Sequence, residues 1–178
     1  MATEIERRFR VVSDAWRSAA SPGRLLRQGY LAQTATATVR VRREDRSASL
    51  TVKSARCGLV REEFTAPLSV AEADFMLERL CGGVVLTKVR HEVEYSGRLW
   101  QVDVFAGAAE GLVIAEVELE GPDQPILLPP WVGKEVTGSR RYRNSTIARR
   151  CARKQARDKK TCSTPAPDLG GQLAAAAT

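Results

Sequence analysis

Alternation of charged or polar residues with apolar residues, repeated in one segment after another, constrains this chain more than any other feature. In TATVRVRRE (residues 36–44), Arg40 and Arg42 alternate with two valines, and in TEIERRF (residues 3–9), Glu4 and Glu6 flank Ile5. Successive side chains of a strand point to opposite faces, so a period of two predicts strands. The same period runs through residues 49–54, 59–68, 87–96, 99–107 and 114–121.

Helical patterns are fewer. Residues 69–83 begin with Ser69 three positions before Glu72, which is the spacing of a capping box, and end at a Gly-Gly pair. A shorter candidate covers residues 12–20, and residues 129–150 predict a turn, a short segment and a C-terminal helix. With a length of 178 residues, the chain suits a single domain. Many strands and few helices predict a β-rich α+β fold.

The charged faces of these strands predict which side of the sheet is inside. Like charges two positions apart repel one another, and a solvated surface gains little from that segregation. The like-charged pairs are Arg40 with Arg42, Glu4 with Glu6, and Glu116 with Glu118. A closed barrel with these faces inward and its apolar faces covered by the helices would gather both signs in one polar cavity. Guanidinium groups bind phosphate and carboxylates bind hard divalent cations, so the pattern predicts a metal-dependent polyphosphate site.

Charge and cysteine content narrow the function classes. The formal net charge of +7 indicates an anionic partner. His91 is the only histidine and none of the four cysteines forms a C-x-x-C pair, which disfavours a zinc site or a Ser-His-Asp triad. We interpret His91 as a half-buried strand residue and the cysteines as structural or incidental. The sequence contains neither an apolar run of about 20 residues nor a signal-peptide pattern, so we expect a cytoplasmic protein without a membrane partner.

The composition changes near residue 150. Residues 151–178 are first basic and then rich in Pro, Gly and Ala. We expect a domain over residues 1–150, followed by a frayed helical end and a disordered tail. The basic cluster of residues 149–160 predicts at most weak contact with nucleic acid, and a solvated tail is the favoured interpretation.

The segment EIERRF resembles the E-x-E-x-K signature of the CYTH superfamily, the triphosphate tunnel metalloenzymes. The likeness continues in order through RQGYL, VRVR, LTVK, REEF, KVRHEV, WQVDVF, GLVIAEVELE, PPWVGKEVTGSRRY and Asn144, over residues 2–150. The resemblance implies a closed eight-stranded antiparallel β-barrel that forms a tunnel. It also implies metal-dependent hydrolysis of a triphosphate, with inorganic tripolyphosphate as the expected substrate and Mg²⁺ or Mn²⁺ as the cofactor.

Motif positions in the resemblance assign roles to individual residues. The metal ligands it implies are Glu4, Glu6, Glu63, Asp103, Glu116 and Glu118. The triphosphate-binding residues it implies are Arg8, Arg40, Arg42, Lys53, Arg61, Lys88, Arg90 and Arg141. Arg8, Lys88 and Glu116 are the catalytic candidates. Lys134 and Glu135 are expected to order the C-terminal segment over the tunnel.

Two positions depart from the family pattern. Arg8 stands where the signature has lysine, and Thr65 stands where many relatives have an acid. A planar guanidinium does not replace an ammonium neutrally, so activity or substrate choice is expected to change. The alternatives are a class IV-type adenylate cyclase, a thiamine or nucleoside triphosphatase, and a non-catalytic polyphosphate-binding module. A monomer or a homodimer is expected, and Tyr30 and the three tryptophans are interpreted as packing residues.

Overall fold

The computed structural model describes residues 2–55, 60–82 and 84–161. The strands are β1 Ala2–Val11, β2 Arg24–Gln33, β3 Ala37–Glu44, β4 Ser47–Ser54, β5 Val60–Leu68, β6 Leu86–Tyr95, β7 Arg98–Ala106, β8 Val113–Glu118 and β9 Val132–Glu135. The α-helices are α1 Val70–Arg79 and α2 Asn144–Thr161. Three 3₁₀ turns are η1 Ala15–Ala19, η2 Gly107–Ala109 and η3 Arg140–Tyr142. Each segment for which the sequence predicted a strand contains one.

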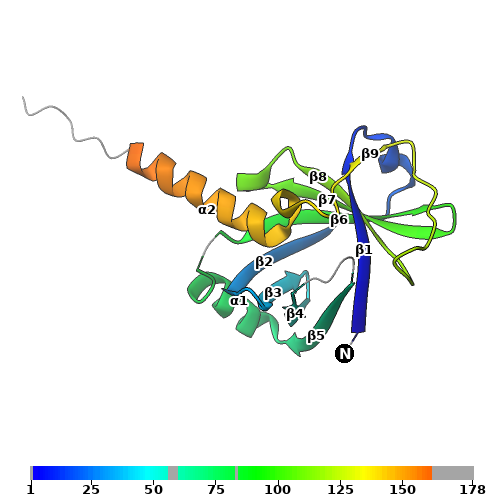
Figure 1. Cartoon of the computed structure of the whole chain (residues 1–178). Helices are drawn as coiled ribbons and strands as arrows, with labels where there is room; N and C mark the ends of the chain where they lie inside the picture. Colours follow the sequence, from blue (N-terminus) through cyan, green and yellow to red (C-terminus); the bar gives the residue numbers. More distant parts are fainter. Residues whose placement is uncertain (1, 56–59, 83, 162–178) are drawn as a thin grey trace, which may run out of the picture.

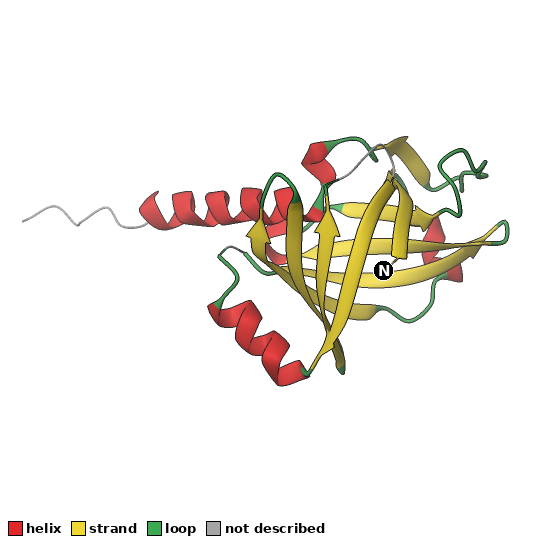
Figure 2. Ribbon diagram, turned by 60° about the horizontal axis from the view of Figure 1, so that its bottom comes forward, coloured by secondary structure: helices red, strands yellow, loops and turns green. Residues whose placement is uncertain are grey.

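Eight of the strands close into an antiparallel barrel (Figures 1 and 2). Neighbouring strands follow the order β5-β4-β3-β2-β6-β7-β8-β1, and β1 pairs again with β5 to complete the ring. The closing contact is short, from Ala2 opposite Glu63 to Ile5 opposite Val60. The predicted closed barrel is therefore confirmed.

Strand β1 changes its partner on one edge. Beyond Ile5 that edge leaves β5, and from Phe9 it pairs with β9. Between these two partners, the backbone N–H of Arg8 donates to Oγ1 of Thr137 and the backbone N–H of Val136 donates to the carbonyl of Arg8. The segment after β9 is thereby fastened to β1 at the level of Arg8.

The outer wall of the barrel is apolar, and loops as well as a helix cover it. Over β1, β6, β7 and β8, the cover is Trp16 of η1 and Trp131 of the loop before β9. The first belongs to a short 3₁₀ helix within the helix candidate of residues 12–20, whereas the second comes from a loop where we expected a helix. The Trp100 ring lies 5.7 Å from that of Trp131 and 5.6 Å from that of Phe9, between ring centroids. The three tryptophans are packing residues, as predicted, since each is at most 4% exposed.

Helix α1 covers the outer side of β2, β3 and β4. Ala73 and Leu77 pack on Val41. The predicted capping box is present, because Ser69 Oγ accepts from the backbone N–H of Glu72 while the Glu72 carboxylate accepts from the Ser69 backbone. These reciprocal bonds satisfy donors that the first helical turn leaves without partners.

Helix α2 packs on the inner side of the barrel at one end and then projects away from it (Figure 1). Its residues Ile147, Ala148 and Cys151 contact a cluster that includes Leu86, Phe105 and Ile114. Leu86, Phe105 and Ile114 are each two residues away from a charged residue on the same strand, namely Lys88, Asp103 and Glu116. Side chains two residues apart lie on one face of a strand, so these three also point inward. The lumen is therefore apolar where α2 closes it and charged beyond that level.

Helix α2 continues past residue 150, where we expected the domain to end. The domain boundary itself stays a prediction. Residues 162–178, where a disordered tail was predicted, lie outside the described residues, as do Cys57 and Cys162. Within the described ranges, no helix is long and apolar enough to span a bilayer.

Candidate active site

Most of the predicted site residues lie on the inward faces of the barrel strands. Each strand contributes side chains of one parity, as the alternation in the sequence requires. Ion pairs within hydrogen-bond range connect many of them across neighbouring strands. The residues joined in this way are Glu4, Glu6, Arg8, Lys53, Glu63, Lys88, Arg90, Asp103 and Glu116.

Arg8 lies between two carboxylates. Its NH2 atom is 3.0 Å from Oε1 of Glu6, and its Nε is 3.0 Å from Oε1 of Glu116 on β8. Nε is close to Glu116 but has no hydrogen bond of good geometry, so this contact is mainly electrostatic. Burial alone would lower the pKa of Arg8, but Glu116 and Glu6 outweigh it and raise that pKa. Arg8 therefore stays charged at any working pH.

A deeper layer is built by Lys88, Arg90, Asp103 and Glu116. Lys88 and Asp103 are both 0% exposed, and the Lys88 ammonium donates to the Asp103 carboxylate. Arg90 donates to Asp103 through Nε at 2.6 Å and to Glu116 through NH2 at 2.9 Å. Burying these charges is tolerated because each has a partner. The layer is a rigid block of alternating charge.

Three groups in this layer have altered pKa values, and the shifts of Lys88 and Glu116 decide the charge of these two at neutral pH. Burial, opposed by Asp103 and reinforced by Arg90, lowers the pKa of Lys88 to about 7. For Glu116, burial would raise the pKa, but Arg8 and Arg90 outweigh it and lower the pKa well below the usual range. Glu116 is therefore ionised at neutral pH, whereas Lys88 loses its charge near neutrality.

Lys53 organises the opposite side of the lumen. Its ammonium is 2.5 Å from Oε1 of Glu4 and 2.6 Å from Oε2 of Glu63. Thr65, the second departure from the family pattern, donates to Glu63 at 2.9 Å, and its hydroxyl lies 3.2 Å from that of Thr51. Thr65 thus supports Glu63 by a hydrogen bond and adds no negative charge.

Arg40 and Arg42 carry positive charge that the lumen acids do not fully balance. Arg40 donates to Thr51 at 3.2 Å and has no carboxylate within ion-pair range among the residues described, and the only such acid for Arg42 is Glu44, at 3.5 Å. The Nε atoms of both arginines are buried without a hydrogen bond. Burial, with repulsion from Arg40 and Arg90, lowers the pKa of Arg42 to about 10. An anion in the lumen would relieve both deficits.

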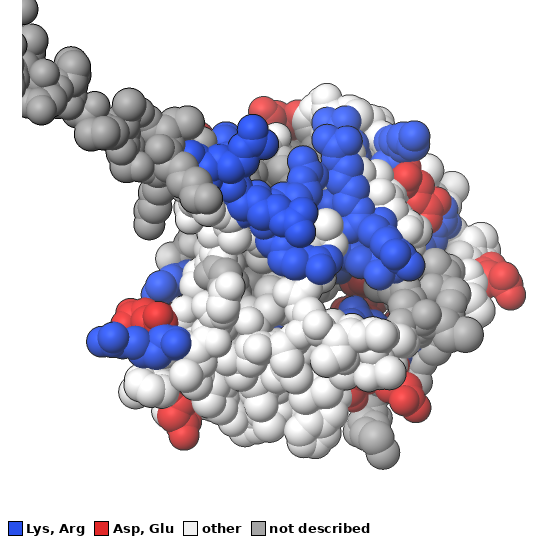
Figure 3. Space-filling model, turned by 60° about the vertical axis from the view of Figure 1, so that its left-hand side comes forward, with Lys and Arg blue, Asp and Glu red and all other residues white. Residues whose placement is uncertain are grey.

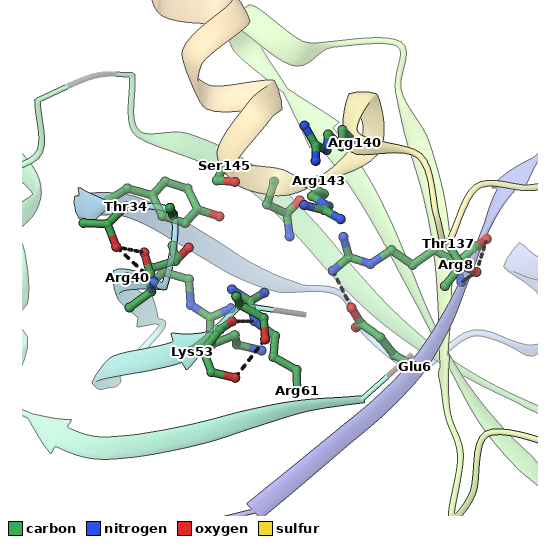
Figure 4. A pocket seen from close by; sticks show the side chains of 17 residues that line it. Glu6, Arg8, Thr34, Arg40, Lys53, Arg61, Thr137, Arg140, Arg143 and Ser145 are labelled. Atoms are coloured by element: carbon green, nitrogen blue, oxygen red, sulfur yellow. Dashed lines mark hydrogen bonds and ion pairs between the residues drawn. The ribbon is translucent and has the colours of Figure 1, made fainter. Parts of the chain in front are cut away.

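A cavity of about 280 Å³ is lined by Arg40 but not by Arg42. Figure 4 shows Arg8 and Glu6 from β1 facing Arg40, Lys53 and Arg61 across it. Arg61 also donates to the carbonyl of Ser54 at 2.7 Å. In the space-filling view, a hollow with charged side chains at its base opens below a broad field of Lys and Arg (Figure 3).

Sequence reasoning missed several residues that line this cavity. Four of them are Tyr30, Thr137, Arg140 and Arg143. Tyr30 was interpreted as a packing residue, but its hydroxyl accepts a hydrogen bond from Nε2 of Gln28. The two residues are two positions apart on β2, so the polar Gln28 could have indicated that Tyr30 lies on the polar face of the strand. The other three lie after β9, in irregular structure without periodicity, so no pattern could assign their direction.

Two predicted residues lie elsewhere. Glu118 is exposed at the end of β8, although it is the register partner of the buried Glu6. Arg141 is exposed and stacks on Tyr142, on a cavity different from the one that Arg140 and Arg143 line. In the motif after β9, Lys134 is exposed, and Glu135 accepts from Arg7 and from Thr137.

The carboxylates of the lumen suit a divalent cation in their chemistry. Oε2 of Glu4 is buried without a hydrogen bond and could accept one more positive partner. Glu6 and Glu116 face the same space, and oxygen ligands are those that Mg²⁺ and Mn²⁺ prefer. In the described part of the chain, however, no three acidic, His or Cys side chains are grouped closely enough to hold a metal, because Arg8 lies between Glu6 and Glu116. The carboxylate oxygens therefore fit a divalent cation, but the ion pairs of Arg8 with Glu6 and Glu116 would have to rearrange before one could bind.

The fold and the site together define a class: closed antiparallel barrels whose interior is lined by paired charges with an excess of arginine. The CYTH domain family model matches residues 2–151, and the chain belongs to this family.

Two similar proteins are both named inorganic triphosphatase. The protein of Acetivibrio thermocellus is 42% identical over 149 residues, which cover 84% of this chain and 95% of the relative. The protein of Nitrosomonas europaea is 36% identical over 152 residues, covering 82% and 97%. Among solved structures, the inorganic triphosphatase NE1496 superposes with a TM-score of 0.60 at 34% identity, covering 82% of this chain and 97% of that one.

Proposed function

We propose that this protein hydrolyses inorganic tripolyphosphate to pyrophosphate and phosphate inside the barrel, with Mg²⁺ or Mn²⁺ as cofactor. The observation that carries the proposal is the buried, incompletely balanced positive charge of Arg40 and Arg42. Guanidinium groups with free N–H donors bind phosphate oxygens strongly. Relatives at 42% and 36% identity that are named inorganic triphosphatase support this substrate.

The size and lining of the cavity favour a bare phosphate chain. Its volume of about 280 Å³ lies just below the range for drug-sized small-molecule sites. The lining is mainly charged residues and hydroxyl groups, with Tyr30 as its single aromatic side chain among the described residues. A nucleoside would require more apolar surface than this, so an adenylate cyclase or nucleoside triphosphatase is less well supported.

The protein side chains divide the work in the proposed mechanism. Arg40 and Arg42 bind the phosphate chain, and Arg90 places fixed positive charge in the deep layer, where Lys88 adds positive charge only while it is protonated. Negative charge that develops on the transferring and leaving phosphates is stabilised by these preorganised donors. Glu116 keeps its charge at neutral pH because Arg8 and Arg90 hold it ionised.

Metal binding would use the carboxylates that share the lumen with Arg8. Glu4, Glu6 and Glu116 are the residues we expect to hold the ion, with Asp103 and Glu63 in support. A divalent cation there would supply charge for the phosphate oxygens and would polarise the attacking water. Arg8 would have to loosen its hold on Glu6 or Glu116 for the ion to enter.

Phosphate release tests the proposal directly. Purified protein with tripolyphosphate and Mg²⁺ or Mn²⁺ should release phosphate, and EDTA should stop the release. Glu116→Gln removes a lumen charge and should lower the rate by about 100-fold or more, in the range of removing one electrostatic group from an active site. Glu94→Gln is the matched control, since Glu94 is exposed near the end of β6. Phosphate release that persists in Glu116→Gln would reject the site.

A substrate panel separates the remaining alternatives. Tripolyphosphate, pyrophosphate, ATP and thiamine triphosphate should each be supplied with each metal. Cyclic AMP formed from ATP would indicate a cyclase. Tight metal-dependent binding of tripolyphosphate without turnover would indicate a non-catalytic binding module.

We also infer that the protein works in the cytoplasm. Cys81 and Cys151 are both free thiols, which suits a reducing compartment. Fractionation of the native cells would test the location.

A further inference from the structure

A second cationic cavity, called the outer cavity below, lies at the end of the barrel that α2 closes, where β1, η2, η3 and α2 meet. Its volume is about 440 Å³. Four of the residues that line it are cationic: Arg10 on β1, Arg141 on η3, and Arg150 and Lys154 on α2. Arg150 and Lys154 are one helical turn apart, so their side chains lie on one face of α2.

The four cations are not neutralised by protein acids. Within the described part of the chain, none of them has a carboxylate within ion-pair range, and no acidic residue lines the cavity. In contrast, Arg7, Arg17 and Arg24 on other exposed surfaces all pair with acids. Four like charges around one concavity repel one another and attract anions.

The floor of this cavity is apolar. Ala108, Ala109 and Leu112 line it together with Tyr142 and Ile147. The first three are exposed or half-buried, so their surface is accessible to a ligand. A cationic rim above an apolar floor differs from the barrel lumen, whose lining is mainly charged or hydroxyl-bearing. The cavity therefore suits an anion that carries a ring.

The η3 turn separates this cavity from the tunnel. Arg140 and Arg143 line the tunnel cavity, whereas Arg141 and Tyr142 between them line the outer one. Strand β1 divides in the same way: Arg8 lines the tunnel cavity, and Arg10, two residues further along the same face, lines the outer one. Two separate anion sites therefore share one wall, and a ligand in either of them would contact neighbouring residues of the same turn.

We propose that this outer cavity, defined by Arg10, Arg141, Arg150 and Lys154, binds a nucleotide. The base lies against Leu112 and Tyr142, and the phosphates contact the four cations. This site is additional to the phosphate-chain site of the lumen and does not depend on hydrolysis there. Its volume lies within the range of small-molecule sites.

The test uses ADP, without divalent metal, in a protein whose tunnel site has been weakened by Arg40→Gln. Calorimetric titration should give one ADP bound per chain. Arg150→Glu with Lys154→Glu should weaken this binding about tenfold or more, which corresponds to about 1.4 kcal/mol. In nuclear magnetic resonance spectra, ADP should shift the backbone amides of Leu112 and Tyr142.

The control reverses the same number of charges on another face of the same helix. Arg149 and Arg153 are also one turn apart and exposed, and both line a different cavity. Arg149→Glu with Arg153→Glu should change ADP affinity less than threefold. Thermal melts of each variant establish that it is folded.

Three results would overturn the proposal. The first is no ADP binding to Arg40→Gln protein, and the second is equal weakening by both charge-reversed pairs. The third is tight binding of a single-stranded RNA oligomer without ADP binding, which would indicate a nucleic-acid surface instead. Inorganic tripolyphosphate that binds at this site as tightly as ADP would show that the apolar floor plays no part.

Discussion

Arg8 and Glu116 are direct partners in the register of β1 and β8, and Nε of Arg8 lies 3.0 Å from Oε1 of Glu116 inside the barrel. The same guanidinium reaches Glu6 on its own strand, also at 3.0 Å. One planar fork thus joins two carboxylates that would otherwise face each other. A lysine has one ammonium and contacts two carboxylates only where both approach that single nitrogen, as Glu4 and Glu63 do at Lys53, whereas Arg8 uses separate nitrogens for Glu6 and Glu116. Arginine at this position therefore ties together two acids that we expect to bind metal.

Arg8→Lys should tighten metal binding. Lysine keeps the charge but releases one of the two carboxylates, which becomes available as a ligand. We expect Mn²⁺ to bind several-fold more tightly, because each tenfold in affinity needs only about 1.4 kcal/mol. Free Mn²⁺ measured by electron paramagnetic resonance during a titration gives the affinity without reference to turnover.

Arg7→Lys is the matched control for this prediction. Arg7 is the neighbouring residue, and it pairs with Glu135 at 2.6 Å on the outer side of the strand. The Arg7→Lys variant should leave Mn²⁺ affinity unchanged. Equal Mn²⁺ affinities in the parent and in Arg8→Lys would show that Arg8 does not restrain the acids.

The low pKa of Lys88 should make stability depend on pH. Its folded pKa of about 7 lies below the usual 10.5, so between these values the unfolded chain binds a proton that the folded chain does not. Stability rises with pH wherever the unfolded state binds more protons. This group should therefore increase the free energy of unfolding from pH 7 to pH 9 by on the order of 2 kcal/mol.

Urea unfolding at pH 7 and pH 9 measures this effect, with Lys88→Met as the comparison. Methionine has a similar length and does not titrate, while Asp103 keeps its contacts with Arg90. The rise with pH should be smaller in the variant by about that amount. The same rise in both proteins would assign the pH dependence to other groups.

The sequence predicted the barrel because its signal is local and repeated. Alternation placed Arg40, Lys88 and Glu116 on the charged faces of their strands, and the segregation of like charges predicted that these faces point inward. Glu118 shows the limit of that reasoning. It shares its parity with Glu116, but parity does not tell how far along a strand the lumen ends, and Glu118 is exposed.

Irregular segments were the part that the sequence could not predict. Trp131 covers the outer wall from a loop, although helices were expected there. Leu86, Phe105 and Ile114 have inward parity yet are apolar, because α2 packs on them. Such long-range contacts leave no period in the sequence. The capping box at Ser69 could be predicted, since both of its bonds are made within four residues.

Ser69→Ala should destabilise the protein by about 1 kcal/mol, the typical cost of losing an N-cap side chain. The hydroxyl accepts from the backbone N–H of Glu72 at 3.2 Å, and alanine leaves this donor without its cap. The midpoint of urea unfolding reports the change. Ser13→Ala is the control, since Ser13 is exposed and lies outside the helices and strands. A midpoint equal to that of the control would mean that the cap contributes nothing.

Arg143 and Arg141 are two residues apart on opposite sides of η3, so they distinguish the structure from the motif-based assignment. The motif implied that Arg141 binds the triphosphate, whereas the structure places Arg143 on the lumen cavity. Arg143→Ala should raise KM for tripolyphosphate about tenfold, the loss expected for one charge-assisted hydrogen bond, with kcat changing less. Arg141→Ala should raise KM by a smaller factor. If Arg141→Ala had the larger effect, η3 would have to turn when the substrate binds, and the separation of the two cavities would be wrong.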